Sequence, residues 1–306
     1  MNNLSYDVNS YITMLQMSSK QRVLVEGRSD RIHLKNLLSH FKMSRKTQID
    51  TAQDIRGNSD KNKKCNRQKI EDIHALCHEI KSTYFLCDRE FREFNITDKI
   101  DDNLKTHFQR NQLFWTLGHS LENYFFEIDI LSDAYSYLSF SEYKSEAISK
   151  FEQILPSAFL IIAAISLSAM ECKSASYPMG IIKWNNFILK ENTVSLDEKI
   201  IYDNDINRSF ISSLNKFLPI MIKSNPIDCS RLCRGHTGII MLQRLFSACL
   251  YETAREHNED IALEYATRFN NLSEENVSCA LSESWSRQVK AQQAQYPEPL
   301  INRLIS

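Results

Sequence analysis

The sequence predicts an α/β protein whose N-terminal part is a parallel sheet with helices on its faces. Short apolar runs, rich in β-branched or aromatic residues, occupy residues 22–25, 83–87 and 113–116. Segments with helical apolar periodicity lie between the first two runs, and strand and helix in alternation are typical of a parallel sheet. The 306 residues include only 6 Gly and 6 Pro, which favours long helices over a loop-rich all-β fold.

The first predicted strand covers residues 22–25 and leads into a helix for which Asp30 is the expected N-cap. A weaker strand is predicted at 47–49. Residues 57–67 are polar, basic and aperiodic, so we expect an exposed loop there.

A second helix is predicted after this loop, because apolar side chains recur at helical spacing at Ile70, Ile73, Cys77 and Ile80. The clearest strand follows at 83–87 and ends in Asp88, and another covers 113–116. Each strong strand thus runs into an acidic residue at its end or a few residues later, and parallel α/β sheets place their chemistry at the carboxyl ends of their strands.

The second half of the chain is predicted to be helical. Helical stripes cover 143–170, 205–223, 239–257 and 262–269. We therefore expect two domains, an α/β domain over 1–130 and a helical domain over 131–306. The most apolar window, 158–170, is too short to span a bilayer and predicts a buried helix, not a membrane segment.

Bulk composition points to a soluble, cytoplasmic protein. The N-terminus has no basic segment followed by an apolar one, which predicts that there is no signal peptide. Eight cysteines without a CxxC pair fit reduced thiols. The overall net charge is −1, but residues 20–69 carry 14 Lys and Arg against 5 Asp and Glu, a local charge of +9. This basic stretch is either a solvated face or a phosphate-binding surface.

Five carboxylates form the candidate metal site: Glu26, Asp30, Asp88, Glu90 and Glu122. An extended backbone at 88–90 would point both of its acids the same way. Clustered acids need a counter-charge, and oxygen ligands favour Mg²⁺, with Mn²⁺ as the alternative. Such a site suits phosphoryl transfer.

Each acid also has a structural interpretation. Taken alone, Asp30 is better explained as a helix N-cap than as a metal ligand, and Glu90 can be explained by solvation and pairing with Arg89 or Arg92. Glu122 could instead bind neighbouring backbone. The recurrence of acids after several strands is what favours a metal site over these separate explanations.

The motifs carry a family resemblance. Val23-Leu-Val-Glu-Gly-Arg-Ser-Asp30 resembles the opening motif of TOPRIM domains, and Asp88-Arg-Glu90 resembles their Asp-x-Asp motif. Ser120-Leu-Glu122 is similar to the second-metal element of the OLD nucleases. The string 119–124 together with 234–236 resembles the AriB family of TOPRIM effectors from PARIS anti-phage systems.

This resemblance implies a Rossmann-like TOPRIM domain followed by a helical region, and a toxic Mg²⁺-dependent nuclease. It implies tRNA as the substrate, cut in the anticodon arm to stop translation. It further implies an AriA-like ABC-type ATPase that holds the effector inactive, and release of the effector as a homodimer.

Within this scheme Glu26, Asp30, Asp88 and Glu90 hold one metal ion and Glu122 helps to hold another, or Glu26 acts as the general acid/base. Glu90 departs from the family by replacing an aspartate, which lengthens its reach by one methylene. Gly235-His236 stands where relatives often have Gly-Lys.

Other residues are candidates for nucleic-acid contacts. Arg234 and His236 are expected either to bind phosphate, with His236 stabilising charge in the reaction, or to serve a structural role at a helix start. The remaining candidates are all basic: Arg28, Lys61, Lys63, Lys64 and Arg67.

Two other functions use the same features. A DNA nuclease of the OLD type would employ the same carboxylates, and metal chemistry does not separate DNA from tRNA cleavage. A TOPRIM-like scaffold that binds the ATPase or nucleic acid without catalysis is the second alternative. Digestion of plasmid DNA and tRNA, and titration with Mg²⁺, distinguish these alternatives.

Overall fold

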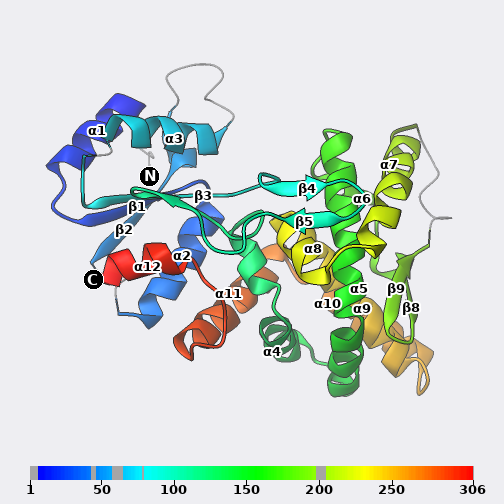
Figure 1. The fold of residues 1–306 in the computed structure, drawn as a ribbon. Coiled ribbons are helices and arrows are strands. Elements are labelled where there is room, and N and C mark those ends of the chain that lie inside the picture. The colour runs from blue at the N-terminus through cyan, green and yellow to red at the C-terminus, as the bar shows by residue number, and fades with distance from the viewer. Residues whose placement is uncertain (1–5, 43–45, 57–64, 78, 198–204, 306) are drawn as a thin grey trace. The chain divides into compact units, whose positions relative to one another are not determined.

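The computed structural model describes residues 6–42, 46–56, 65–77, 79–197 and 205–305 (Figure 1). Two compact units interleave along the chain. The first contains Met1–Arg89, Leu104–Leu121 and Trp285–Ser306, and the second contains Glu90–Asn103 and Glu122–Ser284. The predicted domain boundary near residue 130 stays a prediction.

A five-stranded sheet forms the centre of the first unit, with the strand order β2-β1-β3-β7-β6. The strands are β1 (Gln21–Val25), β2 (Thr47–Thr51), β3 (Thr83–Cys87), β6 (Gln109–Arg110) and β7 (Leu113–Trp115). Neighbours from β2 to β7 are parallel, whereas β6 runs antiparallel to β7. The predicted α/β class, a mostly parallel N-terminal sheet followed by a mainly helical region, is confirmed.

Helices cover both faces of this sheet. They are α1 (Val8–Met17), α2 (Arg28–His40), the 3₁₀ helix η1 (Ala52–Asp54), α3 (Asn66–Cys77) and α12 (Glu298–Ile305). Figure 1 shows α1 and α3 on one side of the sheet and α2 and α12 on the other. Helices on both faces bury every residue of a central strand, so successive positions are apolar. Val23, Leu24 and Val25 of β1 are accordingly fully buried.

The second unit is built mainly from helices. Its helices are α4 (Ile128–Leu138), α5 (Lys144–Glu171), α6 (Tyr177–Ile181), α7 (Asp205–Ile222), α8 (Pro226–Leu232), α9 (Gly235–Ala254) and α10 (Glu259–Asn270), and α11 (Glu274–Lys290) begins there. Its shorter elements are the 3₁₀ helices η2 (Leu121–Phe125, which begins at the edge of the first unit) and η3 (Trp184–Asn186), with the hairpin strands β4 (Phe94–Ile96), β5 (Ile100–Asp102), β8 (Phe187–Lys190) and β9 (Thr193–Leu196). Four core aromatics pack on one another: Tyr135, Phe151, Phe246 and Phe269.

Helix α5 contains the apolar window predicted to be a buried helix, and its burial is confirmed. Ile162, Ile165 and Leu167 are among its fully or almost fully buried residues. The helix has 28 residues and matches the predicted helical stripe over 143–170 to within one residue at each end, and among the described residues it alone is long and apolar enough to cross a membrane. Most of its apolar stretch, 72%, is buried inside the protein, and core helices of soluble proteins pass the same test.

Several element predictions need correction at their ends. Residues 57–64 of the predicted basic loop lie outside the described residues, but Arg67 belongs to α3 rather than to a loop. That helix ends at Cys77, so Ile80 lies beyond it. Helix α1 was not predicted, although Asp7 accepts a hydrogen bond from the Ser10 N–H as its N-cap and Val8, Tyr11 and Leu15 form a buried stripe.

Candidate functional site

Glu26 and Asp88 are brought together at the carboxyl ends of two neighbouring parallel strands. Glu26 directly follows β1 and Asp88 directly follows β3. The Asp88 backbone N–H donates a hydrogen bond to Glu26 Oε1, with a distance of 3.0 Å between the two heavy atoms. The two residues are 62 positions apart in the chain, and the parallel pairing of β1 with β3 brings them together. Their hydrogen bond holds the two acidic segments next to each other.

Asp30 lies in the first turn of α2, but it is not the N-cap that the sequence suggested. The helix begins at Arg28, so Gly27 is the N-cap and Asp30 is the third helical residue. Its Oδ2 accepts a hydrogen bond from the Gly27 N–H at 2.7 Å, which satisfies a backbone donor at the helix start. The Asp30 side chain is therefore buried beside the turn that carries Glu26.

Gly27 has φ −122°, a conformation that any residue adopts, so the turn does not require glycine for its backbone angles. A Cβ built there would lie 3.4 Å from Asp30 Oδ2, which is ordinary contact. Neither the backbone angles nor the space at this position therefore requires a glycine.

The segment after β3 is held by Arg89, whose side chain is almost fully buried. Its backbone N–H donates to Thr116 Oγ1 at 3.0 Å, and its Nη1 donates to the Leu117 carbonyl at 2.7 Å. Thr116 Oγ1 in turn donates to the Gly118 carbonyl at 2.8 Å. The loop after β7 thus fixes the backbone next to Asp88.

Glu90 does not continue an extended backbone. Its φ is 55°, in the left-handed region that a non-glycine residue rarely adopts. The expectation that Asp88 and Glu90 point the same way from an extended segment is therefore wrong, because the chain turns at Glu90. Non-glycine residues with such angles cluster at functional sites, where surrounding structure holds them.

The motif arginine Arg28 is paired within the first unit. Arg28 Nη2 lies 2.8 Å from Asp54 Oδ1, and Arg31 Nη1 lies 3.3 Å from Asp54 Oδ2. Thr51 Oγ1 also donates to Asp54 at 2.7 Å. Burial alone would raise the pKa of Asp54, but the hydrogen bonds from Thr51 and Arg28 and the two positive charges hold this pKa below its usual value.

A second group of candidate residues lies in the second unit, around Glu122. Glu122 is 4% exposed, and its Oε1 lies 3.9 Å from His236 Nε2. The other imidazole nitrogen, Nδ1, contacts the Glu274 carboxylate. The hydrogen bond with Glu274 raises the pKa of His236 against the opposing effect of burial, and the charge of Glu122 adds to the increase. Two carboxylates thus favour the imidazolium cation at the start of α9.

The surrounding backbone anchors this group. Asn123 Nδ2 donates to the carbonyls of Ser230 at 2.7 Å and Cys233 at 2.9 Å. Arg234 is the N-cap residue of α9, and its Nη1 donates to the Ala175 carbonyl at 2.8 Å. Arg234 thus stands at the start of α9, although its side chain makes no capping hydrogen bond, and its contact with phosphate stays a prediction.

The five predicted carboxylates are divided between the units. Glu26, Asp30 and Asp88 belong to the first, and Glu90 and Glu122 belong to the second. Among the residues that the structure describes, no three His, Cys, Asp or Glu side chains are grouped so that they could hold a metal ion. Coordination by three of these acids would therefore require their side chains to rearrange. A metal site formed by all five stays a prediction.

The remaining predicted contacts with nucleic acid are less well placed. Lys61, Lys63 and Lys64 lie outside the described residues. Arg67 lies in α3 with a side chain that is 15% exposed, and its Nε is 3.9 Å from Glu71. Asp54 and Glu274 were missed at the sequence level, since nothing near them in the chain marks them as partners of Arg28 and His236.

Comparison with known proteins adds no assignment to this geometry. No protein-family model matches the chain, and no curated protein matches it.

Proposed function

We propose that this protein is a Mg²⁺-dependent nuclease whose first unit is a TOPRIM-type catalytic region. The observation that carries the proposal is the hydrogen bond between Glu26 and the Asp88 backbone, at the carboxyl ends of β1 and β3. It joins the two acidic motifs at the edge of a parallel sheet where α/β enzymes place their chemistry. Asp30, bonded to the turn after Glu26, adds a third carboxylate to the same region.

The donor set fits a hard divalent cation. Glu26, Asp30 and Asp88, with Glu90 from the turn that follows, would hold one Mg²⁺, for which Mn²⁺ is the alternative, and Glu122 would help to hold a second. Each carboxylate has two oxygens, so an oxygen that accepts a backbone N–H leaves the group able to ligate. When bound, the metal polarises the phosphodiester and lowers the pKa of a water nucleophile. In the alternative mechanism Glu26 would act as the general acid/base.

His236 would contribute positive charge to the reaction. Its raised pKa favours the imidazolium form, which suits stabilisation of developing negative charge on a phosphate. Glu274 keeps the ring oriented through Nδ1. His236 would thereby supply the cation that relatives often carry as a lysine at this position.

The biological role follows from the motif resemblance and is proposed with it. The protein would be a toxic effector of anti-phage defence in the cytoplasm, of the AriB type. It would cleave tRNA in the anticodon arm after release, as a homodimer, from an AriA-like ABC-type ATPase. The basic character of residues 20–69, with a charge of +9, fits a polyanionic substrate.

The test is a pair of substitutions at one position, Glu26→Gln and Glu26→Ala. Glu26→Gln retains an oxygen that can accept the Asp88 N–H and removes the charge, so the fold should persist. Loss of a metal-binding carboxylate should lower cleavage of purified tRNA by about 100-fold or more and abolish the heat of Mg²⁺ binding in a calorimetric titration. Glu79→Gln, at an exposed carboxylate in the same unit, is the matched control and should cleave as the wild type does.

Full tRNA and DNA cleavage by Glu26→Gln would sink the proposal. Plasmid DNA degraded in a Glu26-dependent manner, with intact tRNA, would move the assignment to a DNA nuclease with the same site. A non-catalytic scaffold is favoured by one observation, the absence of a three-residue metal group among the described residues. No Mg²⁺ binding by the wild-type protein would support that alternative.

A further inference from the structure

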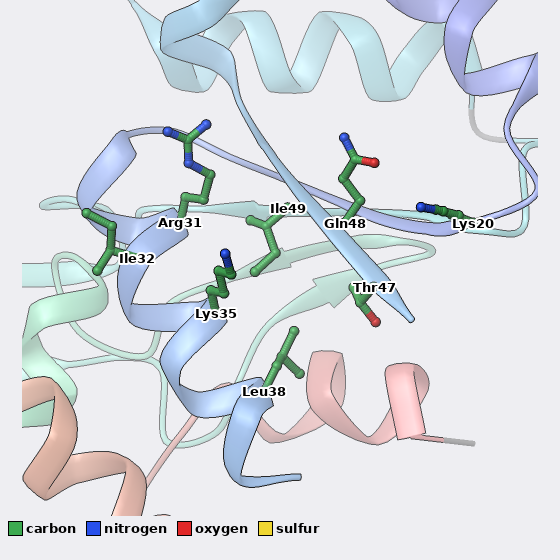
Figure 2. Close-up of a pocket in the computed structure, with 8 residues that line it drawn as sticks. All are labelled: Lys20, Arg31, Ile32, Lys35, Leu38, Thr47, Gln48 and Ile49. Atoms are coloured by element: carbon green, nitrogen blue, oxygen red, sulfur yellow. The ribbon is translucent and has the colours of Figure 1, made fainter. Parts of the chain in front are cut away.

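A groove lies along the edge of the first unit, between α2 and the edge strand β2 (Figure 2). It has a volume of about 540 Å³ and is lined by Lys20, Arg31, Ile32, Lys35, Leu38, Thr47, Gln48 and Ile49. Figure 2 shows Arg31 and Lys35 extending from α2, with Ile49 directed from β2 toward the helix. Among the apolar lining residues Leu38 is buried, Ile49 is half-buried and Ile32 is exposed.

The groove carries three cations and no acid among its lining residues. Arg31 is partly neutralised by Asp54, 3.3 Å away, and Asp54 also binds Arg28. Lys20 and Lys35 are exposed, and neither forms an ion pair with any residue in the described part of the chain. Two unneutralised ammonium groups in one groove are an electrostatic site for phosphate.

The cations are spread along the sheet edge instead of gathered at one point. Arg31 lies in the first part of α2, which starts next to the carboxyl end of β1, whereas Leu38 is two turns further on. Thr47 begins β2 and pairs with Gln21, so Lys20 and Thr47 mark the amino ends of the strands. Strand β2 contributes Thr47, Gln48 and Ile49 to the lining, so the groove follows about 10 Å of this strand from its amino end.

This extent distinguishes a chain of phosphates from a single one. Arg31 and Lys35 are four residues apart on one helix face, which separates them by about 6 Å along the helix axis. Lys20 lies at the amino ends of β1 and β2, away from the strand ends that carry Glu26 and Asp88. The spacing therefore suits successive phosphates of a polymer that enters from the edge carrying Glu26 and Asp88.

We propose that the α2–β2 groove binds the sugar–phosphate backbone of the nucleic-acid substrate through Lys20, Arg31 and Lys35. This rests on the proposed nuclease function and gives it a substrate track on the first unit, independent of the basic segment 57–64. The contacts are to phosphates, so the groove contributes affinity and register with little choice of base. Arg31, positioned by Asp54, marks the end of the track nearest the carboxylates.

The experiment measures binding without cleavage. Fluorescently labelled total tRNA is titrated with the full-length protein in EDTA, across a salt series, for the wild type and for Lys20→Gln/Lys35→Gln. Loss of two phosphate contacts should reduce the slope of log K against log salt by about 1.4–1.8. With binding at 1 M salt unchanged, this corresponds to a roughly 25- to 60-fold loss of affinity at 0.1 M.

The matched control is Lys81→Gln/Lys190→Gln, which removes the same charge from two exposed lysines outside the groove. A salt slope for the groove variant equal to that of this control would overturn the proposal. ATP and tripolyphosphate are added as competitors. The displacement of tRNA by each competitor is compared, per phosphate added, with the displacement by an unlabelled oligonucleotide. If ATP or tripolyphosphate is as effective as the oligonucleotide, and if its effect requires Lys20 and Lys35, the groove is a site for small polyanions and the proposed backbone track is wrong.

Binding in EDTA does not depend on catalysis, so the two proposals fail separately. If Lys20- and Lys35-dependent binding is normal and Glu26→Gln still cleaves fully, the proposed carboxylate site is refuted and the groove stands. If cleavage depends on Glu26 but the salt slope of the groove variant is unchanged, the groove proposal is refuted and the carboxylate site stands.

Discussion

Thr116→Val tests whether the loop after β7 holds the backbone beside Asp88. The substitution replaces the hydroxyl with a methyl group of similar size. Thr116 Oγ1 accepts from the Arg89 N–H at 3.0 Å and donates to the Gly118 carbonyl at 2.8 Å, and its side chain is almost fully buried. The change therefore removes two buried hydrogen bonds while preserving the packing volume.

The expected destabilisation follows from these two bonds. Each buried backbone group that loses its partner costs about 1–3 kcal/mol. The two losses share one side chain and do not add fully, so we expect about 2–4 kcal/mol for Thr116→Val. Thr116→Ser keeps the hydroxyl and removes a buried methyl, which costs about 1 kcal/mol.

Two measurements check this reasoning. Urea unfolding gives the free energy for each variant, and hydrogen exchange read by mass spectrometry reports protection of the segment containing Arg89. Thr116→Val should accelerate exchange there and, under the proposed function, weaken Mg²⁺ binding through Asp88. If Thr116→Val is as stable as Thr116→Ser, or exchange at Arg89 is unchanged, the loop does not hold this backbone.

Two further predictions concern the second unit. Gly238→Ala should lower the free energy of unfolding, measured in urea, by about 1–3 kcal/mol, because the new Cβ would lie 2.4 Å from Phe126 Cζ. Gly180→Ala is the control and should be neutral or stabilising, because nothing lies within 4 Å of its Cβ. Equal effects of the two substitutions would contradict the packing argument. Glu274→Gln should lower the pKa of His236 in an NMR titration, since its hydrogen bond is the largest cause of the raised value. Because the pKa of His236 is raised in the folded state, this group stabilises the wild-type fold fully below the unfolded pKa of 6.5, and the stabilisation is lost as the pH rises through the folded pKa. Glu274→Gln should therefore be less stable than the wild type at acid pH and equally stable well above the folded pKa. An unchanged titration of His236 in this variant would refute the pairing.

Local patterns in the sequence were enough to find the four parallel strands of the sheet, but the short antiparallel strand β6 was not predicted. The strand over 83–87 and the helices over 205–223 and 262–269 were predicted close to their observed bounds, because apolar periodicity directly reports which face is buried. Helix α1 was missed despite an N-cap and an apolar stripe. Helix ends were less accurate, as at Cys77, since they depend on capping contacts that the periodicity does not contain.

The candidate site was only partly accessible to sequence reasoning. Acids after β1 and β3 could be expected to lie close together, because parallel strands carry their carboxyl ends to one edge, and the Glu26–Asp88 hydrogen bond agrees with this. The turn at Glu90 could not be expected, because a left-handed glutamate is held by its surroundings and not by its own preference.

The sequence by itself therefore determined the α/β class, the position of the acidic motifs at strand ends and the burial of α5. Tertiary structure decided which side chains meet: Asp54 with Arg28, Glu274 with His236, and the Lys20 and Lys35 groove. These contacts join residues far apart in the chain, and their geometry depends on how helices and strands pack. Periodicity reports burial one element at a time and carries no information on such pairs.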